Sequence, residues 1–85
     1  MKEEKIGVVL HYYSKAGVAA IKLGEALKVG DKIHIKGHTT DFDEVINSIQ
    51  IEHNQVNEAR KGDDIGIKVI DHVREHDTVY KVTEQ

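Results

Sequence analysis

Residues 27–36, Leu-Lys-Val-Gly-Asp-Lys-Ile-His-Ile-Lys, combine a tight turn with an alternating strand. Gly30 can adopt the positive φ that such a turn needs and that a β-branched residue resists. After the turn, apolar and polar residues alternate, which places Ile33 and Ile35 on one face of a strand. A period of two residues, rather than 3.6, predicts a half-buried β-strand.

The same period recurs on both sides of this segment. Six strands are predicted, at residues 6–13, 18–23, 32–36, 42–52, 65–70 and 78–82. The second has its inner face at Ala19, Ile21 and Leu23. In 42–52 the apolar residues do not share one parity, so we expect a bulge near Asp43–Glu44.

Two segments carry a weaker pattern. Residues 53–61 fit either a helical turn or a poor strand, and the polar stretch 71–77 is predicted to be a loop. Six short, evenly spaced strands predict an all-β fold, a small antiparallel barrel. The alternative is a helical hairpin through residues 43–61, where helix-forming residues are common.

Length and composition limit the functions that the chain can have. Its 85 residues, 39% of them apolar, suffice for a single domain, residues 1–85 with a core at about 5–83. A net charge of −3 argues against a general polyanion binder but allows a local basic patch. The absence of cysteine excludes disulfides and thiolate chemistry and favours a cytoplasmic location. The many Lys and Glu residues are typical of a thermophile.

The sequence lacks the motifs of the common catalytic and cofactor sites. No phosphate-binding Gly-x-x-x-x-Gly-Lys-Ser/Thr loop is present, and the two serines lie outside any Gly-x-Ser-x-Gly turn. The histidines spaced by four fall on a strand end and in a loop, where that spacing has no meaning for a metal. Aspartates beside turns most often accept backbone hydrogen bonds. We therefore expect no enzyme activity, no cofactor and no metal.

Two strand faces are candidates for binding nucleic acid. On the first strand a cation accompanies rings that can stack on a base: His11, Tyr13 and Lys15. On the third strand, basic residues about 7 Å apart approach the phosphate spacing of a single strand: Lys32, His34, Lys36 and His38. The alternative interpretation is an ordinary solvated face, on which lysine prevents edge-to-edge aggregation.

Three turns in register suggest a family. They are Leu-Lys-Val-Gly-Asp-Lys-Ile (27–33), Ala-Arg-Lys-Gly-Asp-Asp-Ile-Gly-Ile (59–67) and His-Asp-Thr-Val-Tyr (76–80). Their order and spacing resemble the second domain of translational GTPases such as elongation factor Tu. With Gly-His-Thr-Thr-Asp-Phe (37–42), the pattern resembles that of small stand-alone translation elongation factor-like proteins.

The resemblance implies a six-stranded Greek-key barrel without a GTPase site. It further implies a non-catalytic module that contacts tRNA or ribosomal RNA, which with three or four phosphate contacts would bind weakly and with salt sensitivity. A related barrel ends the collagenase-like peptidases linked to RNA modification. The alternative function is therefore a protein-interaction adaptor, expected to be monomeric, that docks a larger RNA-modifying or peptidase-like enzyme.

Overall fold

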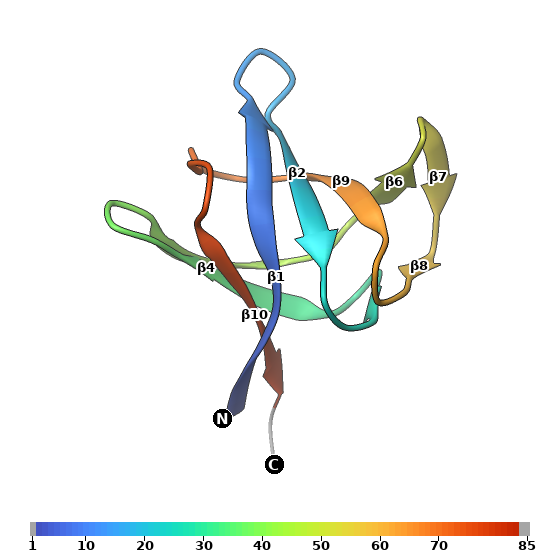
Figure 1. Ribbon diagram of the computed structural model, residues 1–85, viewed down its shortest axis with the longest axis horizontal. Coiled ribbons are helices and arrows are strands. Elements are labelled where there is room, and N and C mark those ends of the chain that lie inside the picture. Colours follow the sequence, from blue (N-terminus) through green and yellow to red (C-terminus); the bar gives the residue numbers. More distant parts are fainter. Residues whose placement is uncertain (1, 84–85) are drawn as a thin grey trace.

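The computed structural model describes residues 2–83, and every regular element in that range is a β-strand (Figure 1). The strands are β1 (Lys2–Tyr13), β2 (Val18–Leu23), β3 (Leu27–Lys28), β4 (Lys32–Lys36), β5 (Asp41–Val45), β6 (Ile49–Ile51), β7 (Asn54–Val56), β8 (Glu58–Ala59), β9 (Asp64–Lys68) and β10 (Thr78–Thr83). The alternative of a helical hairpin at 43–61 is therefore wrong. Nothing in residues 2–83 forms a helix of the length and apolarity needed to cross a membrane.

Eight strands form one sheet in the order β5-β4-β10-β1-β2-β9-β6-β7, and β3 pairs with β8 in a second sheet of two strands. All of these pairings are antiparallel, which confirms the all-β prediction. The expected count of six strands is wrong, because residues 42–61 contribute to four short strands instead of one and because β3 was not predicted. Within residues 2–83, no strand pairing joins the end strands β5 and β7.

Three turns share one geometry, in which a backbone position with positive φ is followed by an aspartate. The positive-φ residues have φ of 97°, 93° and 74° at Gly30, Gly62 and His76. The next residue accepts a hydrogen bond through Oδ2 from the N–H three residues earlier, at 3.0, 2.9 and 2.9 Å for Asp31, Asp63 and Asp77. The three motifs found in the sequence are thus three copies of one Asp-stabilised turn.

The first of these turns bridges the two ends of the large sheet. The Gly30 N–H donates to the carbonyl of Ile46, just beyond β5, at 2.9 Å. The Val29 N–H donates to the carbonyl of Asn57, between β7 and β8, also at 2.9 Å. The two end strands, which do not pair with each other, are therefore connected through residues 27–31.

Strand β1 does not keep the strict alternation predicted for 6–13. Its register shifts after Lys5 in the pairing with β10 and after Val9 in the pairing with β2. Each bulge moves the following residues to the other face of the sheet. As a result Ile6 and Val9 are both buried, whereas Leu10 is 46% exposed.

The segment predicted as one bulged strand at 42–52 is divided into β5 and β6. Between them the chain leaves the ladder, and the N–H of Ile46 donates to the carbonyl of Asp31 at 2.8 Å while its side chain is buried. The expected bulge near Asp43–Glu44 is therefore absent, and the change of parity comes from this break. Residues 53–61 form the short strands β7 and β8, not a helical turn.

The core is filled from the inner faces of the sheet. The predicted inner residues Ala19, Ile21 and Leu23 are at most 2% exposed, and Ile33 and Ile35 are fully buried. The predicted loop at 71–77 is confirmed, and its one apolar residue, Val73, also enters the core. The strand predicted at 65–70 ends at Lys68, and Ile70 is 73% exposed.

The hairpin between β4 and β5 approaches the turn before β10 closely. A Cβ added to Gly37 would overlap the carboxylate of Asp77, whose side chain is buried. That carboxylate also stabilises the turn that begins at Arg74. The position requires glycine because of the space available, not because of its φ.

The first and last strands of the described chain, β1 and β10, are neighbours in the sheet. Lys2 at the start of β1 pairs with Thr83 at the end of β10, and Figure 1 shows both ends on the same side of the molecule.

Candidate functional site

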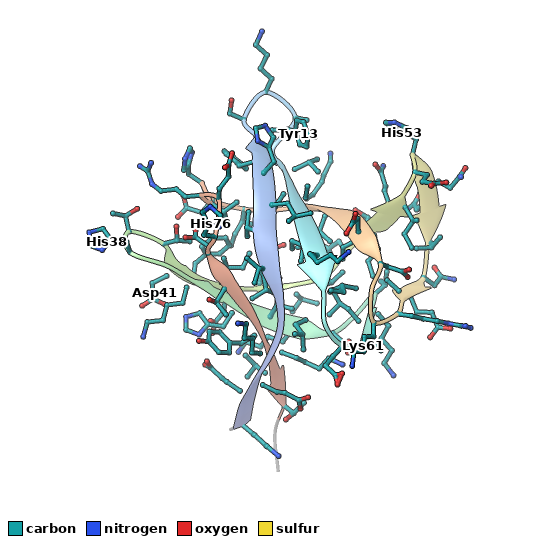
Figure 2. All side chains as sticks on the ribbon, in the orientation of Figure 1. Tyr13, His38, Asp41, His53, Lys61 and His76 are labelled. Atoms are coloured by element: carbon teal, nitrogen blue, oxygen red, sulfur yellow. The ribbon has the colours of Figure 1, made fainter. Side chains whose placement is uncertain are left out.

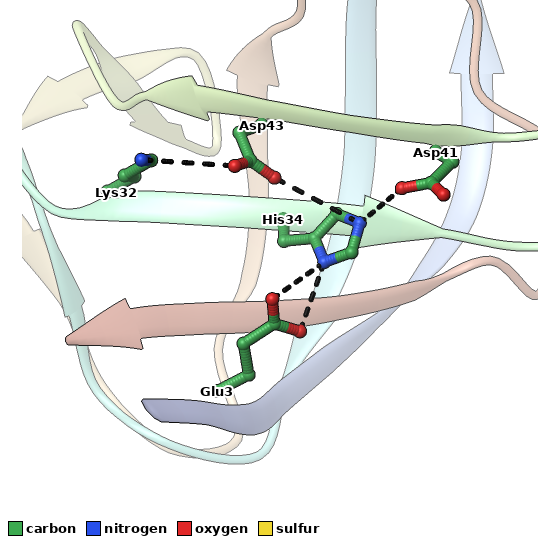
Figure 3. Close-up of polar contacts among 5 residues, drawn as sticks. All are labelled: Glu3, Lys32, His34, Asp41 and Asp43. Atoms are coloured by element: carbon green, nitrogen blue, oxygen red, sulfur yellow. Dashed lines mark hydrogen bonds and ion pairs between the residues drawn. The ribbon is translucent and has the colours of Figure 1, made fainter. Parts of the chain in front are cut away.

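The outer face of β4 carries the predicted basic residues, but carboxylates surround them. Lys32, His34 and Lys36 share this face, opposite the buried Ile33 and Ile35. Three acidic side chains from other strands lie against it, those of Asp41 and Asp43 on the adjacent β5 and that of Glu3 on β1, beyond β10 (Figure 3).

His34 lies at the centre of this cluster, with 14% of its side chain exposed. Its Nδ1 lies 3.0 Å from both carboxylate oxygens of Glu3, and its Nε2 lies 2.5 Å from Oδ1 of Asp41 (Figure 3). A neutral imidazole has only one N–H, so it would direct a lone pair at one of these carboxylates. The geometry therefore fits an imidazolium that donates from both nitrogens.

The pKa directions agree with this assignment. The hydrogen bond with Asp41, followed by that with Glu3, raises the pKa of His34 above 6.5. In turn, the bond from His34 holds the pKa of Asp41 below its ordinary value. The cluster is a charged clamp that ties β1, β4 and β5 together.

The lysines of this face differ in their surroundings. The Nζ of Lys32 lies 3.8 Å from Oδ2 of Asp43, while Lys36 is exposed at the end of β4. His38 is exposed in the hairpin between β4 and β5 (Figure 2). With three carboxylates against the middle of the strand, the face does not present the continuous positive potential that a phosphate backbone requires.

The candidates on the first strand lie elsewhere. His11 and Tyr13 do share a face, and their rings meet edge to face with centroids 4.5 Å apart. Lys15 belongs to the turn between β1 and β2, not to the strand. Tyr13 is the last residue of β1, at the base of that turn, and β10 separates β1 from β4, so the two predicted sets do not form one surface (Figure 2).

A hollow that sequence reasoning missed lies on the outer face of β2, β9 and β6. This open hollow has a volume of about 480 Å³. Its lining residues are Tyr13, Ala16, Val18, Ala20, Gln50, Glu52, His53, Asp64, Ile65 and Gly66. The available signal was the outward positions of β2, which are Val18 and Ala20 where a solvated strand normally carries polar residues. Their place opposite Gly66 depends on the pairing of β2 with β9, which the sequence alone does not give.

A second hollow, of about 390 Å³, lies between the β4–β5 hairpin and the loop before β10. Its lining is polar, and within it Nε of Arg74 donates to Oγ1 of Thr39 at 2.9 Å. Among residues 2–83, no group of three or more His, Asp and Glu side chains has the arrangement needed to hold a metal ion.

Comparison with known proteins relates this fold to proteases. No model of a known protein family matches the chain. It is 46% identical over 81 residues to an uncharacterized protease of Methanocaldococcus jannaschii, and 37% identical over 79 residues to a collagenase of Porphyromonas gingivalis. These alignments cover 94% and 89% of this chain but 20% and 22% of the relatives, so the chain spans about a fifth of their length.

Solved structures show which part of a protease is concerned. The C-terminal domain of a Geobacillus thermoleovorans protein assigned to the U32 peptidases superimposes with a TM-score of 0.88 at 25% identity, covering 94% of this chain and 93% of that domain. The chain is homologous to the C-terminal domain of U32 peptidases. A selenomethionine variant of the same Geobacillus domain gives a TM-score of 0.85.

This homology corrects the expectation drawn from the turn motifs. Assignment to the translation elongation factor-like proteins is wrong, because 46% identity over nearly the whole chain links it to a protease instead. The predicted function of an RNA-contacting translation module falls with that assignment. The three motifs are Asp-stabilised turns of this chain, and they do not place it in that family.

Proposed function

We propose that the chain is a non-catalytic adaptor domain that docks a larger, peptidase-like protein. The observation that carries the proposal is the pattern of coverage: nearly all of this chain matches a segment that makes up about a fifth of each protease relative. In those proteins the homologous domain shares a polypeptide with a much larger remainder. A contact between the two is the simplest use for a domain of this kind.

The composition of the chain is consistent with an adaptor without catalysis. The sequence lacks a nucleotide-binding loop, a nucleophile elbow and cysteine. The histidine with the most carboxylate contacts, His34, is held between two of them in the clamp on β4. We propose that the chain acts as a monomer with respect to itself and binds a partner of another sequence.

The test is titration calorimetry of the chain against the M. jannaschii protease from which the 81-residue homologous segment has been deleted. We expect saturable one-to-one binding, and weaker binding to the intact protease, whose own segment competes. If the shortened protease does not fold, hydrogen exchange of the intact protease with excess chain replaces it, and its own segment should become less protected. Binding to tRNA with none to either protease would overturn the proposal.

We also propose that the large sheet is rolled around its core in the manner of a barrel. Support comes from the turn at 27–31, whose backbone bonds reach Ile46 beyond one end strand and Asn57 beyond the other. The β3–β8 pair, which includes Leu27 and Ala59, would then cover the gap between the two ends.

A further inference from the structure

We propose that the hollow on the outer face of β2, β9 and β6 is the docking groove for an extended partner segment in which an apolar side chain is followed by a lysine or arginine. The inference deepens the proposed adaptor function, on which it rests, by naming the surface and the chemistry of the segment that it takes.

The floor of the groove lies on three neighbouring strands, and on two of them, β2 and β9, its residues are small. Ala20 of β2 lies directly opposite Gly66 of β9, and Gly66 in turn lies opposite Gln50 of β6. The residues next to them along these strands, such as Ala19 and Ile67, point to the other face and belong to the core. Because Ala20 and Gly66 leave room above the sheet, the hollow of about 480 Å³ can accept a side chain from outside.

One wall comes from the β1–β2 hairpin. Tyr13 borders the hollow and is 53% exposed, and its ring contacts that of His11 at a steep angle, with centroids 4.5 Å apart. A half-exposed tyrosine beside an apolar floor is the arrangement that often anchors a partner's apolar side chain.

The other wall comes from the β6–β7 hairpin, whose turn is strained. Glu52 and His53 form its two-residue loop with φ of 50° and 68°. Both positions favour Gly or Asn, and other residues there cost stability. Two bulky side chains at these positions border the groove, and Figure 2 shows Tyr13 and His53 at the same end of the molecule.

The rim of the hollow carries two carboxylates, of which one is paired with a lysine. Glu52 and Asp64 both border the hollow, and Lys22 lies 3.3 Å from Asp64. Among the ion pairs of residues 2–83, none involves Glu52. A basic residue next to the apolar anchor would complement this carboxylate, and a peptide with an acidic residue there would be repelled.

The test is a chemical-shift titration of the ¹⁵N-labelled chain with the capped hexapeptide Gly-Ser-Phe-Lys-Ser-Gly. We expect shifts at the amides of Ala20, Gln50 and Gly66, none with a peptide that has Ser in place of Phe, and at least about tenfold weaker binding with Glu in place of Lys. Shifts located elsewhere, or equal binding of the Lys and Glu peptides, would overturn the groove.

Matched variants separate the groove from the adaptor function. Glu52→Lys should weaken binding of the Phe-Lys peptide by about tenfold or more. Glu58→Lys makes the same charge change at an exposed site on β8 and should leave the dissociation constant within about twofold of that of wild type. If the Glu52→Lys chain binds the shortened protease like wild type, the groove proposal fails and the adaptor proposal stands. If wild type binds the peptide as expected but neither protease form, the groove stands and the adaptor proposal fails.

Discussion

His34 on β4 bonds to the carboxylate of Glu3 on β1 across the intervening strand β10, so one side-chain contact joins two strands that do not pair. With Asp41 on the opposite side, the contact extends over four neighbouring strands. These side chains come within hydrogen-bond distance only because the order of the strands in the sheet brings them together.

The clamp makes stability depend on pH. The raised pKa of His34 means that its contribution is complete below about pH 6.5 and is lost as the pH rises through the folded-state pKa. The pKa of Asp41 is lowered in the folded state, so its contribution to stability is lost only in acid, as the pH falls through this lowered pKa. We expect His34→Gln to lower the thermal midpoint most at about pH 5.5 and much less at about pH 8.5. His38→Gln, an exposed control, should show no such pH trend; an equal loss at both pH values for His34→Gln would contradict the clamp.

Glu44 is predicted to change stability with pH in the same direction as His34, but for a different reason, because its charged form is disfavoured by burial. Burial raises its pKa, against a hydrogen bond of 3.0 Å from the Ile70 N–H. The folded state therefore keeps the proton to higher pH than the unfolded chain, and stability declines as the pH rises through that interval. Glu44→Gln retains an acceptor for Ile70 and should be more stable than wild type at about pH 7 but not at about pH 4. Urea denaturation at the two pH values measures this difference, with the exposed Glu58→Gln variant as the control. The same change in the free energy of unfolding for both variants would refute the prediction.

Gly37 should tolerate no side chain. Gly37→Ala places a methyl group on the carboxylate of Asp77 and should lower the free energy of unfolding by about 2 kcal/mol, because the overpacked turn must move. Gly24→Ala is the matched control, since its added Cβ would meet only the Ile6 carbonyl at 3.8 Å. Comparable losses for the two variants in chemical denaturation would show that the contact with Asp77 is not the cause.

Replacement of two isoleucines that both lie in predicted strands should change the free energy of unfolding by very different amounts. Ile35→Ala empties a fully buried site and should cost about 2–5 kcal/mol. Ile70→Ala, at a site 73% exposed, should change stability by about 0.5 kcal/mol or less. Equal destabilisation would mean that Ile70 is covered in solution, for instance by a second copy, which sedimentation would detect.

His76 occupies the left-handed position that glycine holds in the other two Asp-stabilised turns. His76→Gly should therefore raise the free energy of unfolding by about 0.5–1 kcal/mol, after the entropy that glycine adds to the unfolded chain is subtracted. Glu75→Gly, one residue earlier, removes no positive φ and should not stabilise the protein. A loss of stability on His76→Gly would indicate that its side chain contributes more than its backbone costs.

Strands and turns could be predicted from the sequence where neighbouring residues alone determine them. Alternation located β2 and β4 and their inner faces, and Gly-Asp pairs located the turns at Gly30 and Gly62. It failed at β1, where two bulges change the parity, because a bulge depends on what pairs from β2 and β10. It failed again at Ile46, whose burial depends on a backbone bond to Asp31, 15 positions away along the chain.

The candidate site was harder to predict for the same reason. Lys32, His34 and Lys36 do share one face of β4, but His38 lies beyond the strand, and Glu3, Asp41 and Asp43 from β1 and β5 offset the positive charge of that face. The groove over Ala20 and Gly66 was invisible, because its floor exists only when β2, β9 and β6 lie side by side. Turn chemistry alone also pointed to the wrong family, since an aspartate that accepts a local backbone hydrogen bond is a common feature of turns and does not identify a family.

The side-by-side ends of β1 and β10 have a mechanical consequence. A force that pulls Lys2 away from Thr83 acts perpendicular to β1 and β10. The hydrogen bonds between these two strands would therefore break one after another, whereas a force along the strands would load them all together. Tension applied through covalently attached neighbours would thus peel these two strands at low force, and the Glu3–His34 contact is the first cross-link that such peeling must break.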